Sequence, residues 1–201
     1  MKVQGILKDA KIIKIALIIF GLGFFLGVIG ANVFKDAYFN DMENFLDGYF
    51  DKLYMLDIDQ KRLFGYVFWN NFKKYFLFWF FAMTALGIPY MGISVGYAGL
   101  SAGFLLAVSM VKFGIKGFFL YILYIFPQCF IYFPVAVITL LQGFNMCMNL
   151  YYSGPLNRKG KSKVIFEKVP MILFIFLIIL IGALIEAYIN SFILQKMARF
   201  F

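Results

Sequence analysis

The sequence predicts an all-α fold, a polytopic transmembrane helical bundle of about five spans. Of its 201 residues, 63% are hydrophobic and 14% are charged, whereas a soluble domain is roughly half apolar and a quarter charged. The apolar residues form long uncharged stretches, which one small core cannot bury. Little chain is left outside them, so residues 1–201 are expected to form a single integral membrane domain without a separate soluble one.

The first span is expected at residues 15–34, an uncharged stretch between Lys14 and Lys35. About 20 apolar residues are needed to cross the hydrocarbon layer of a bilayer. The stretch is longer than the apolar region of a cleaved signal peptide, and it lacks an Ala-x-Ala exit. A retained membrane anchor is therefore favoured.

The polar segment 35–74 is predicted to contain an amphipathic helix outside the membrane. Its apolar residues recur mostly at spacings of three and four, with acids on other faces. Residues 36–59 hold seven acids and one lysine, a net charge of −6. The helix either lies along the membrane surface or docks a partner, and its acidity adds weight to docking because surface helices are usually basic. The candidate docking residues are Phe39, Leu46, Phe50 and Leu53.

The uncharged stretch 75–111 is too long for one crossing and is expected to form two spans, 75–91 and 92–111. The helix break between them is placed at Gly87 and Pro89. Proline removes a backbone donor and restricts the residue before it.

Small residues line one face of the second of these spans, and a shorter seam occurs in the first span of the chain. Small side chains let helices approach backbone to backbone in lipid. This seam either holds the protein's own bundle together or contacts a partner. The candidate packing residues are Gly92, Gly96, Gly99, Gly103, Gly23 and Gly27.

The fourth span, 117–152, is expected to be kinked, with a broken or re-entrant segment between Pro127 and Pro134. The piece before Pro127 is only about half a crossing. Non-helical backbone at membrane depth must be buried in protein, and Gln128 is the residue expected to supply hydrogen bonds there. A basic loop, 153–168, then leads to the last span at 169–190.

Glu186 is the one ionisable residue inside the apolar stretches. Intramembrane acids are costly and mark functional candidates. Glu186 lies about one turn from the end of the last span. It therefore either reaches interfacial water or pairs with another helix, of this chain or of a partner, where it would add to the docking residues.

The net charge of +9 is unevenly distributed, because the chain outside residues 36–59 carries +15. Its cations gather in two clusters, 2–14 and 158–168, which flank apolar stretches and suit contact with membrane lipid. If both clusters face the cytoplasm, four crossings lie between them, and the acidic segment and the C-terminus lie outside. No nucleic-acid-binding motif accompanies the cations.

The composition also limits the catalytic and metal-binding sites that the chain can form. The chain contains no histidine, so a Ser-His-Asp triad and a histidine-ligated metal site are excluded. Cys129 and Cys147 lack CxxC spacing and are expected to be buried free thiols. No enzyme activity, catalytic residue, metal, cofactor or small-molecule substrate is expected.

A set of short segments follows a fixed order along most of the chain. The segments are Trp69-Asn70-Asn71, Leu86-Gly87-Ile88-Pro89, Gly114-Ile115-Lys116-Gly117-Phe118, Pro127-Gln128, Pro134, Phe144 and Glu186-Ala187-Tyr188. In this set and in its length, the chain resembles the stage II sporulation protein M family of bacterial membrane proteins. Wider relatives more often carry histidine or glutamate around the region of Pro127 and Pro134, where this chain has Gln128 and Tyr132, and this difference points to the sporulation branch.

The resemblance implies a scaffold in the mother-cell membrane of an endospore-forming bacterium, at the sporulation septum. It implies two partners that remodel septal peptidoglycan while the forespore is engulfed, the stage II sporulation proteins D and P. The alternative is a subunit of a transporter or channel. That alternative depends on the broken fourth span, because discontinuous helices build substrate sites at the membrane midplane.

Overall fold

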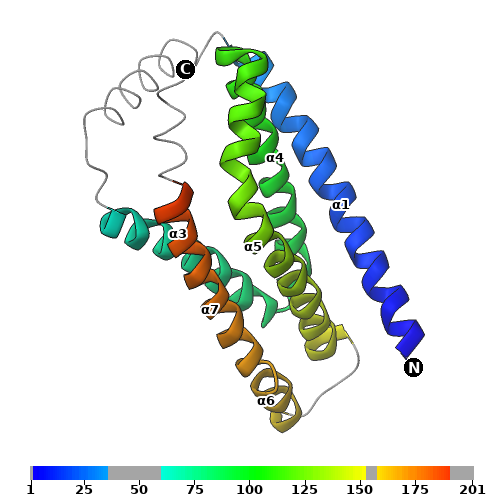
Figure 1. The fold of residues 1–201 in the computed structure, drawn as a ribbon. Helices are drawn as coiled ribbons and strands as arrows, with labels where there is room; N and C mark the ends of the chain where they lie inside the picture. The colour runs from blue at the N-terminus through cyan, green and yellow to red at the C-terminus, as the bar shows by residue number, and fades with distance from the viewer. Residues whose placement is uncertain (1, 36–59, 153–157, 191–201) are drawn as a thin grey trace.

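The computed structural model describes residues 2–35, 60–152 and 158–190, which are helical almost throughout and include no strand. Two π-helical turns, η1 (Met148–Tyr152) and η2 (Glu186–Asn190), extend the ends of α5 and α7. The predicted all-α fold is confirmed. The α-helices are α1 (Lys2–Val33), α3 (Gln60–Ala82), α4 (Gly87–Phe113), α5 (Ile115–Cys147), α6 (Arg158–Phe166) and α7 (Val169–Ile185) (Figure 1).

Four segments of the described chain are long and apolar enough to cross a membrane. Helix α3 is not among them, since polar residues stand at its start (Gln60–Arg62) and in its middle, at Asn70, Asn71, Lys73 and Lys74. The chain is therefore a multi-pass membrane protein, as predicted. The four segments are Asp9–Val33, Gly87–Val111, Cys129–Tyr152 and Ser162–Tyr188.

Helices α1 and α4 pack side by side and run parallel (Figure 1). Gly23 lies against Gly96 and Gly27 against Leu100, so residue numbers rise together along the interface. Parallel helices need a returning segment between them. Helix α3 is the described part of this returning segment. It runs from Gln60 back to the end of the bundle where α4 begins (Figure 1).

Helices α4 and α5 form an antiparallel hairpin that turns at Gly114. Its φ of 59° lies in the left-handed region, which glycine adopts without steric cost. Gly117 then lies directly against the carbonyl of Ser109. Further along the hairpin, the Tyr121 hydroxyl donates a 3.0 Å hydrogen bond to the carbonyl of Ala102.

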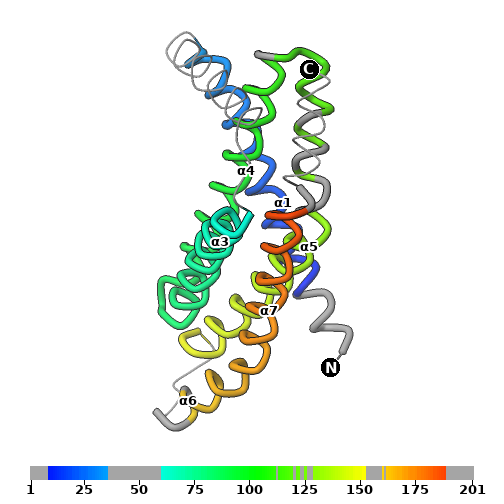
Figure 2. Tube along the Cα trace, turned by 60° about the vertical axis from the view of Figure 1, so that its left-hand side comes forward, coloured from blue at the N-terminus to red at the C-terminus, as the bar shows by residue number. Residues whose placement is uncertain are grey.

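The main hydrophobic core lies among α3, α5 and α7 and reaches the start of α4. Helix α5 therefore belongs to two packed groups, one with α4 and α1 and one with α3 and α7 (Figure 2). The buried members of this core are Trp79, Ala82, Met91, Val135, Met146, Leu150, Ile175 and Ile179.

The structure corrects the predicted boundary between an extramembrane segment 35–74 and a span 75–91. Residues Gln60–Ala82 form one continuous helix, because they contain no proline and a change from polar to apolar residues does not end a helix. The turn to α4 occupies residues 83–86, so 87–91 belong to the next helix. Pro89 stands in the first turn of α4, where its missing N–H would have no helical acceptor.

The predicted broken or re-entrant segment between Pro127 and Pro134 is wrong. Helix α5 continues through both prolines, from Ile115 to Cys147, and bends (Figure 2). Each proline removes only one helical hydrogen bond, which transmembrane helices tolerate. The two prolines are seven residues apart, so both weaken the same face of the helix, which explains a bend without a break.

The basic segment predicted as a loop at 153–168 contains helix α6 (Arg158–Phe166). Lysine and arginine are good helix formers, and no proline interrupts these residues. The predicted docking residues Phe39, Leu46, Phe50 and Leu53 lie outside the described residues.

Both basic clusters lie at the same end of the bundle. Figure 1 shows the N-terminus of α1 and helix α6 at the lower end of the molecule, and Figure 2 shows the same arrangement from another side. The opposite end holds the α4–α5 turn at Gly114 and the end of α1, whereas the end of α7 lies against α3 (Figure 1).

Candidate functional site

A polar network joins three helices within the apolar bundle. The Asn71 side-chain amide of α3 donates a 3.0 Å hydrogen bond to the hydroxyl oxygen of Tyr132 on α5. The Tyr132 hydroxyl donates in turn to Glu186 Oε2 at the start of η2, at 3.2 Å. The Lys74 ammonium is near enough to interact electrostatically with Glu186. The carboxylate thus pairs with other helices of its own chain, one of the alternatives for Glu186 in the sequence.

Gly182 makes room for this network on α7. A Cβ atom at Gly182 would lie 3.0 Å from the Tyr132 ring and 3.1 Å from its hydroxyl oxygen. Gly182 and Glu186 are four residues apart and therefore share one helix face. The tyrosine ring is thereby held between the backbone of α7 and the carboxylate.

The network joins the middle of one helix to the end of another. Tyr132 lies near the middle of α5, and Glu186 directly follows Ile185, the last residue of α7. The Lys73 ammonium lies 5.2 Å from the centroid of the Trp69 ring on α3. Lysine and tryptophan commonly mark a membrane interface.

Replacing Tyr132 with phenylalanine is expected to lower the free energy of unfolding by about 0.6–2 kcal/mol, the range for hydrogen bonds between membrane helices. The change keeps the ring beside Gly182 and removes only the bridging hydroxyl. Tyr97→Phe is the matched control, because Tyr97 is 68% exposed on α4. Thermal unfolding in detergent measures both, and equal melting of the two variants would show that the network contributes no stability.

The glycine seam forms the interface between α1 and α4. A Cβ atom at any of four glycines would collide with backbone carbonyl oxygen of the facing helix. Gly23 faces the carbonyl of Gly96, Gly27 that of Leu100, Gly99 that of Phe20, and Gly103 that of Phe24. The backbones touch here, so these positions have no space for a larger residue.

Gly92 lies outside this interface, in contrast to the prediction from its spacing. Apart from its chain neighbours and the backbone of its own helix, no atom lies within 4 Å of a Cβ built there, whereas a Cβ at Gly96 would meet Ile19 Cγ2 at 3.5 Å. The close contact between α1 and α4 begins at Gly96. Gly92 therefore has no backbone of α1 opposite to it.

The turn between α3 and α4 is held by side chains from the end of α5. Three consecutive carbonyls accept hydrogen bonds there: Met83 from Tyr151 at 3.0 Å, Thr84 from the Cys147 thiol at 3.4 Å, and Ala85 from Tyr152 at 3.3 Å. These carbonyls follow the last turn of α3, and the Thr84 carbonyl also accepts a 3.2 Å hydrogen bond from the Gly87 N–H. Gly87 completes the contact, because a Cβ there would lie 2.9 Å from Cys147 Sγ.

The remaining predicted residues are scattered over the bundle. Pro127, Gln128 and Pro134 lie within α5. Cys147 is buried as expected, but Cys129 is exposed, which corrects the prediction of two buried thiols. Among the described residues, no group of three histidine, cysteine, aspartate or glutamate side chains is placed to hold a metal ion.

A family model described as stage II sporulation protein M matches residues 16–191, nearly the whole chain. The chain belongs to this family. Comparisons with curated proteins and with solved structures give no match. The protein is therefore a sporulation-related membrane protein of the stage II sporulation protein M family.

The residues that suggested the stage II sporulation protein M family lie at the structural joints of the bundle. Asn71 and Glu186 belong to the polar network. Gly87 and Pro89 begin α4 at the turn, and Gly114 and Gly117 form the hairpin between α4 and α5. Several residues of the family motifs therefore lie where these helices contact or join one another.

The sequence singled out Tyr132 only through the difference from wider relatives and did not predict its hydrogen bonds. A tyrosine has no distinctive local signal in a chain of which 21% is aromatic. Asn71 and Glu186 are polar residues at the edges of apolar stretches. That shared property could have suggested that they lie in one polar network. The capping roles of Tyr151 and Tyr152 depend on carbonyls almost seventy residues away along the chain.

Proposed function

We propose that this protein is a non-catalytic scaffold in the mother-cell membrane. It would gather the peptidoglycan-remodelling stage II sporulation proteins D and P at the septum during engulfment. The observation that carries the proposal is the position of the ends of the acidic segment 36–59. The described residues next to it are Lys35, which follows α1, and Gln60, which begins α3. Helix α1 ends and α3 begins away from the basic end of the bundle (Figure 1).

This arrangement supports a segment that leaves the membrane on the side of the cell wall. Helix α1 starts at the basic end and crosses with its apolar segment Asp9–Val33, so residue 36 follows on the other face. With the basic end in the cytoplasm, a stretch of net charge −6 is presented to the compartment where wall-remodelling proteins act. An apolar stripe on an acidic helix gains little from anionic lipid and suits a protein partner.

The rest of the bundle supports a structural role. The polar network and the glycine interface both join helices of this chain to one another. The transporter alternative depends on a broken fourth span, and the continuous α5 removes that support.

The test is the double substitution Phe50→Asp with Leu53→Asp. Two charges on the apolar stripe should abolish recovery of both wall-remodelling proteins in membrane pull-downs and block engulfment, because apolar anchors supply most of the affinity of such a helix. The protein itself should remain at its normal level in the membrane. Immunoblotting of pull-downs and fluorescence microscopy of sporulating cells provide the readouts.

The matched control is Asn40→Asp with Asn44→Asp, which adds the same two charges at positions off the stripe of the predicted helix. This variant should recover both partners, since charges off the stripe affect mainly the rate of approach. Full partner recovery by the stripe variant, at normal abundance, would refute docking through this segment. Equal loss in both variants would assign the effect to charge alone.

A further inference from the structure

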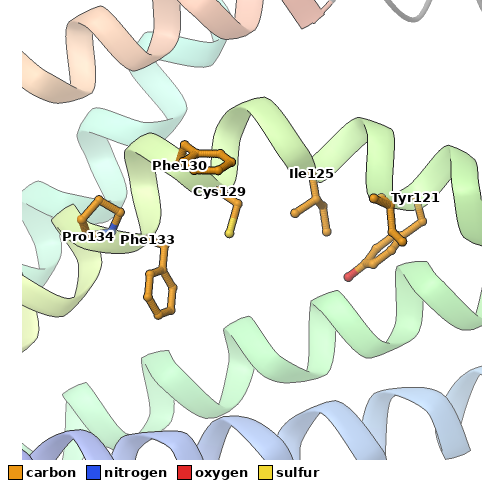
Figure 3. Close-up of a pocket in the computed structure, with 7 residues that line it drawn as sticks. Tyr121, Ile125, Cys129, Phe130, Phe133 and Pro134 are labelled. Atoms are coloured by element: carbon orange, nitrogen blue, oxygen red, sulfur yellow. The ribbon is translucent and has the colours of Figure 1, made fainter.

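An apolar groove of about 500 Å³ runs along the bent part of α5. Figure 3 shows Ile125, Cys129 and Phe133 projecting from one side of this helix toward the ribbon of α4. Seven described residues line the groove: Tyr121, Ile122, Ile125, Cys129, Phe130, Phe133 and Pro134. All of them come from α5, so the shape of this helix forms the groove.

The groove lies at membrane depth. The Tyr121 hydroxyl bonds to the carbonyl of Ala102, which is inside the apolar segment Gly87–Val111 of α4. Because α5 runs antiparallel to α4, its residues after Tyr121 lie level with earlier residues of that segment. Cys129 also begins the apolar segment Cys129–Tyr152 of α5 itself. The groove therefore lies level with the apolar segment of α4, the depth at which lipid chains surround a membrane helix.

We propose that this groove holds one acyl chain of a membrane phospholipid. Among the lining side chains that the structure describes, the polar atoms are the Tyr121 hydroxyl, already bonded to Ala102, and the Cys129 thiol. A polar ligand would find little to bind, whereas a hydrocarbon chain restores the dispersion contacts that an unfilled groove lacks. The site goes beyond scaffolding, because it gives the bundle a structural lipid.

A flexible chain fits this lining better than a partner helix does. Membrane helices associate through small residues that allow close approach, as α1 and α4 do at their glycines. The described lining of the groove contains no glycine or alanine, and its phenylalanines are large and exposed, with Phe130 at 71% and Phe133 at 59%. Such a surface is uneven and leaves gaps that a hydrocarbon chain can follow.

The first test counts bound lipid by native mass spectrometry of the detergent-solubilised full chain, titrated with palmitoyl-oleoyl phosphatidylglycerol. The unmodified chain should retain one lipid, and Cys129→Trp, which fills the groove, should weaken that binding about tenfold. This is the size expected for the loss of roughly ten van der Waals contacts. Ile138→Trp is the control, because Ile138 is 44% exposed on α5 and does not line the groove.

A second test needs no bulky substitution. In a Cys147→Ser chain, saturating phosphatidylglycerol should slow alkylation of Cys129 by N-ethylmaleimide about tenfold. Serine keeps the donor to the Thr84 carbonyl. Ile138→Cys in a chain that also carries Cys129→Ser and Cys147→Ser should be protected less than about twofold.

Two results would overturn the proposal. One is equal lipid binding by the Cys129→Trp and Ile138→Trp chains together with equal protection of positions 129 and 138. The other is a dimer in the native spectrum that Cys129→Trp dissociates without loss of lipid, because a second copy would then occupy the groove.

Discussion

Leucine at Gly99 is expected to separate α1 from α4 and to destabilise the protein more than any other change described above. The new side chain would collide with the backbone of Phe20, and the backbone cannot move aside as a flexible side chain can. Overpacking of this kind costs about 1–3 kcal/mol or more. In a chain of this length it lowers the melting temperature by roughly 5–10 °C. Thermal unfolding in detergent and protein abundance in membranes are the measurements.

Gly92→Leu is the matched control for this experiment. It makes the same change in the same helix and gains the same helix propensity, at a position where, apart from its chain neighbours and the backbone of its own helix, no atom lies within 4 Å of a built Cβ. This variant should melt at or above the temperature of the unmodified protein. If Gly99→Leu and Gly92→Leu melt alike, the α1–α4 interface does not depend on close backbone contact.

Alanine at Gly117 is the second change with a large expected effect. A single methyl group there would meet the carbonyl of Ser109 directly, next to the turn at Gly114. Opening this hairpin shifts α5 along α4 and disturbs the bond between Tyr121 and Ala102. The free energy of unfolding should fall by about 1–3 kcal/mol, although alanine is the better helix former by about 1 kcal/mol.

Gly143→Ala provides the comparison within α5. A Cβ there would meet Phe78 Cε1 at 2.8 Å and Met91 Cε at 2.9 Å, both far ends of side chains that can rotate away. Its stability should change by less than about 1 kcal/mol, because the gain in helix propensity offsets the adjustment. Equal destabilisation by both alanines, measured by chemical denaturation in detergent, would contradict the distinction between backbone and side-chain neighbours.

The prolines of α5 show where local rules mislead. Pro127 and Pro134 each remove a hydrogen bond, and a soluble helix would often end at such residues. In lipid, a broken backbone would expose groups that nothing can satisfy, which costs more than a bend. The helix therefore continues and bends, and the groove around Cys129 is lined by this part of it. Neither consequence was visible from the positions of the prolines alone.

The sequence by itself determined the all-α membrane fold, the family and the uneven distribution of charge along the chain. Apolar stretches, ordered motifs and basic clusters are local properties, and they do not depend on how the helices pack. Only the tertiary structure decided which glycines carry the contact between α1 and α4, since that depends on where two helices cross. It also decided the partners of Glu186. Asn71 and Tyr132 lie 115 and 54 residues before Glu186 in the numbering, and only the packing of α3 and α5 against α7 brings their hydrogen-bonding groups within reach.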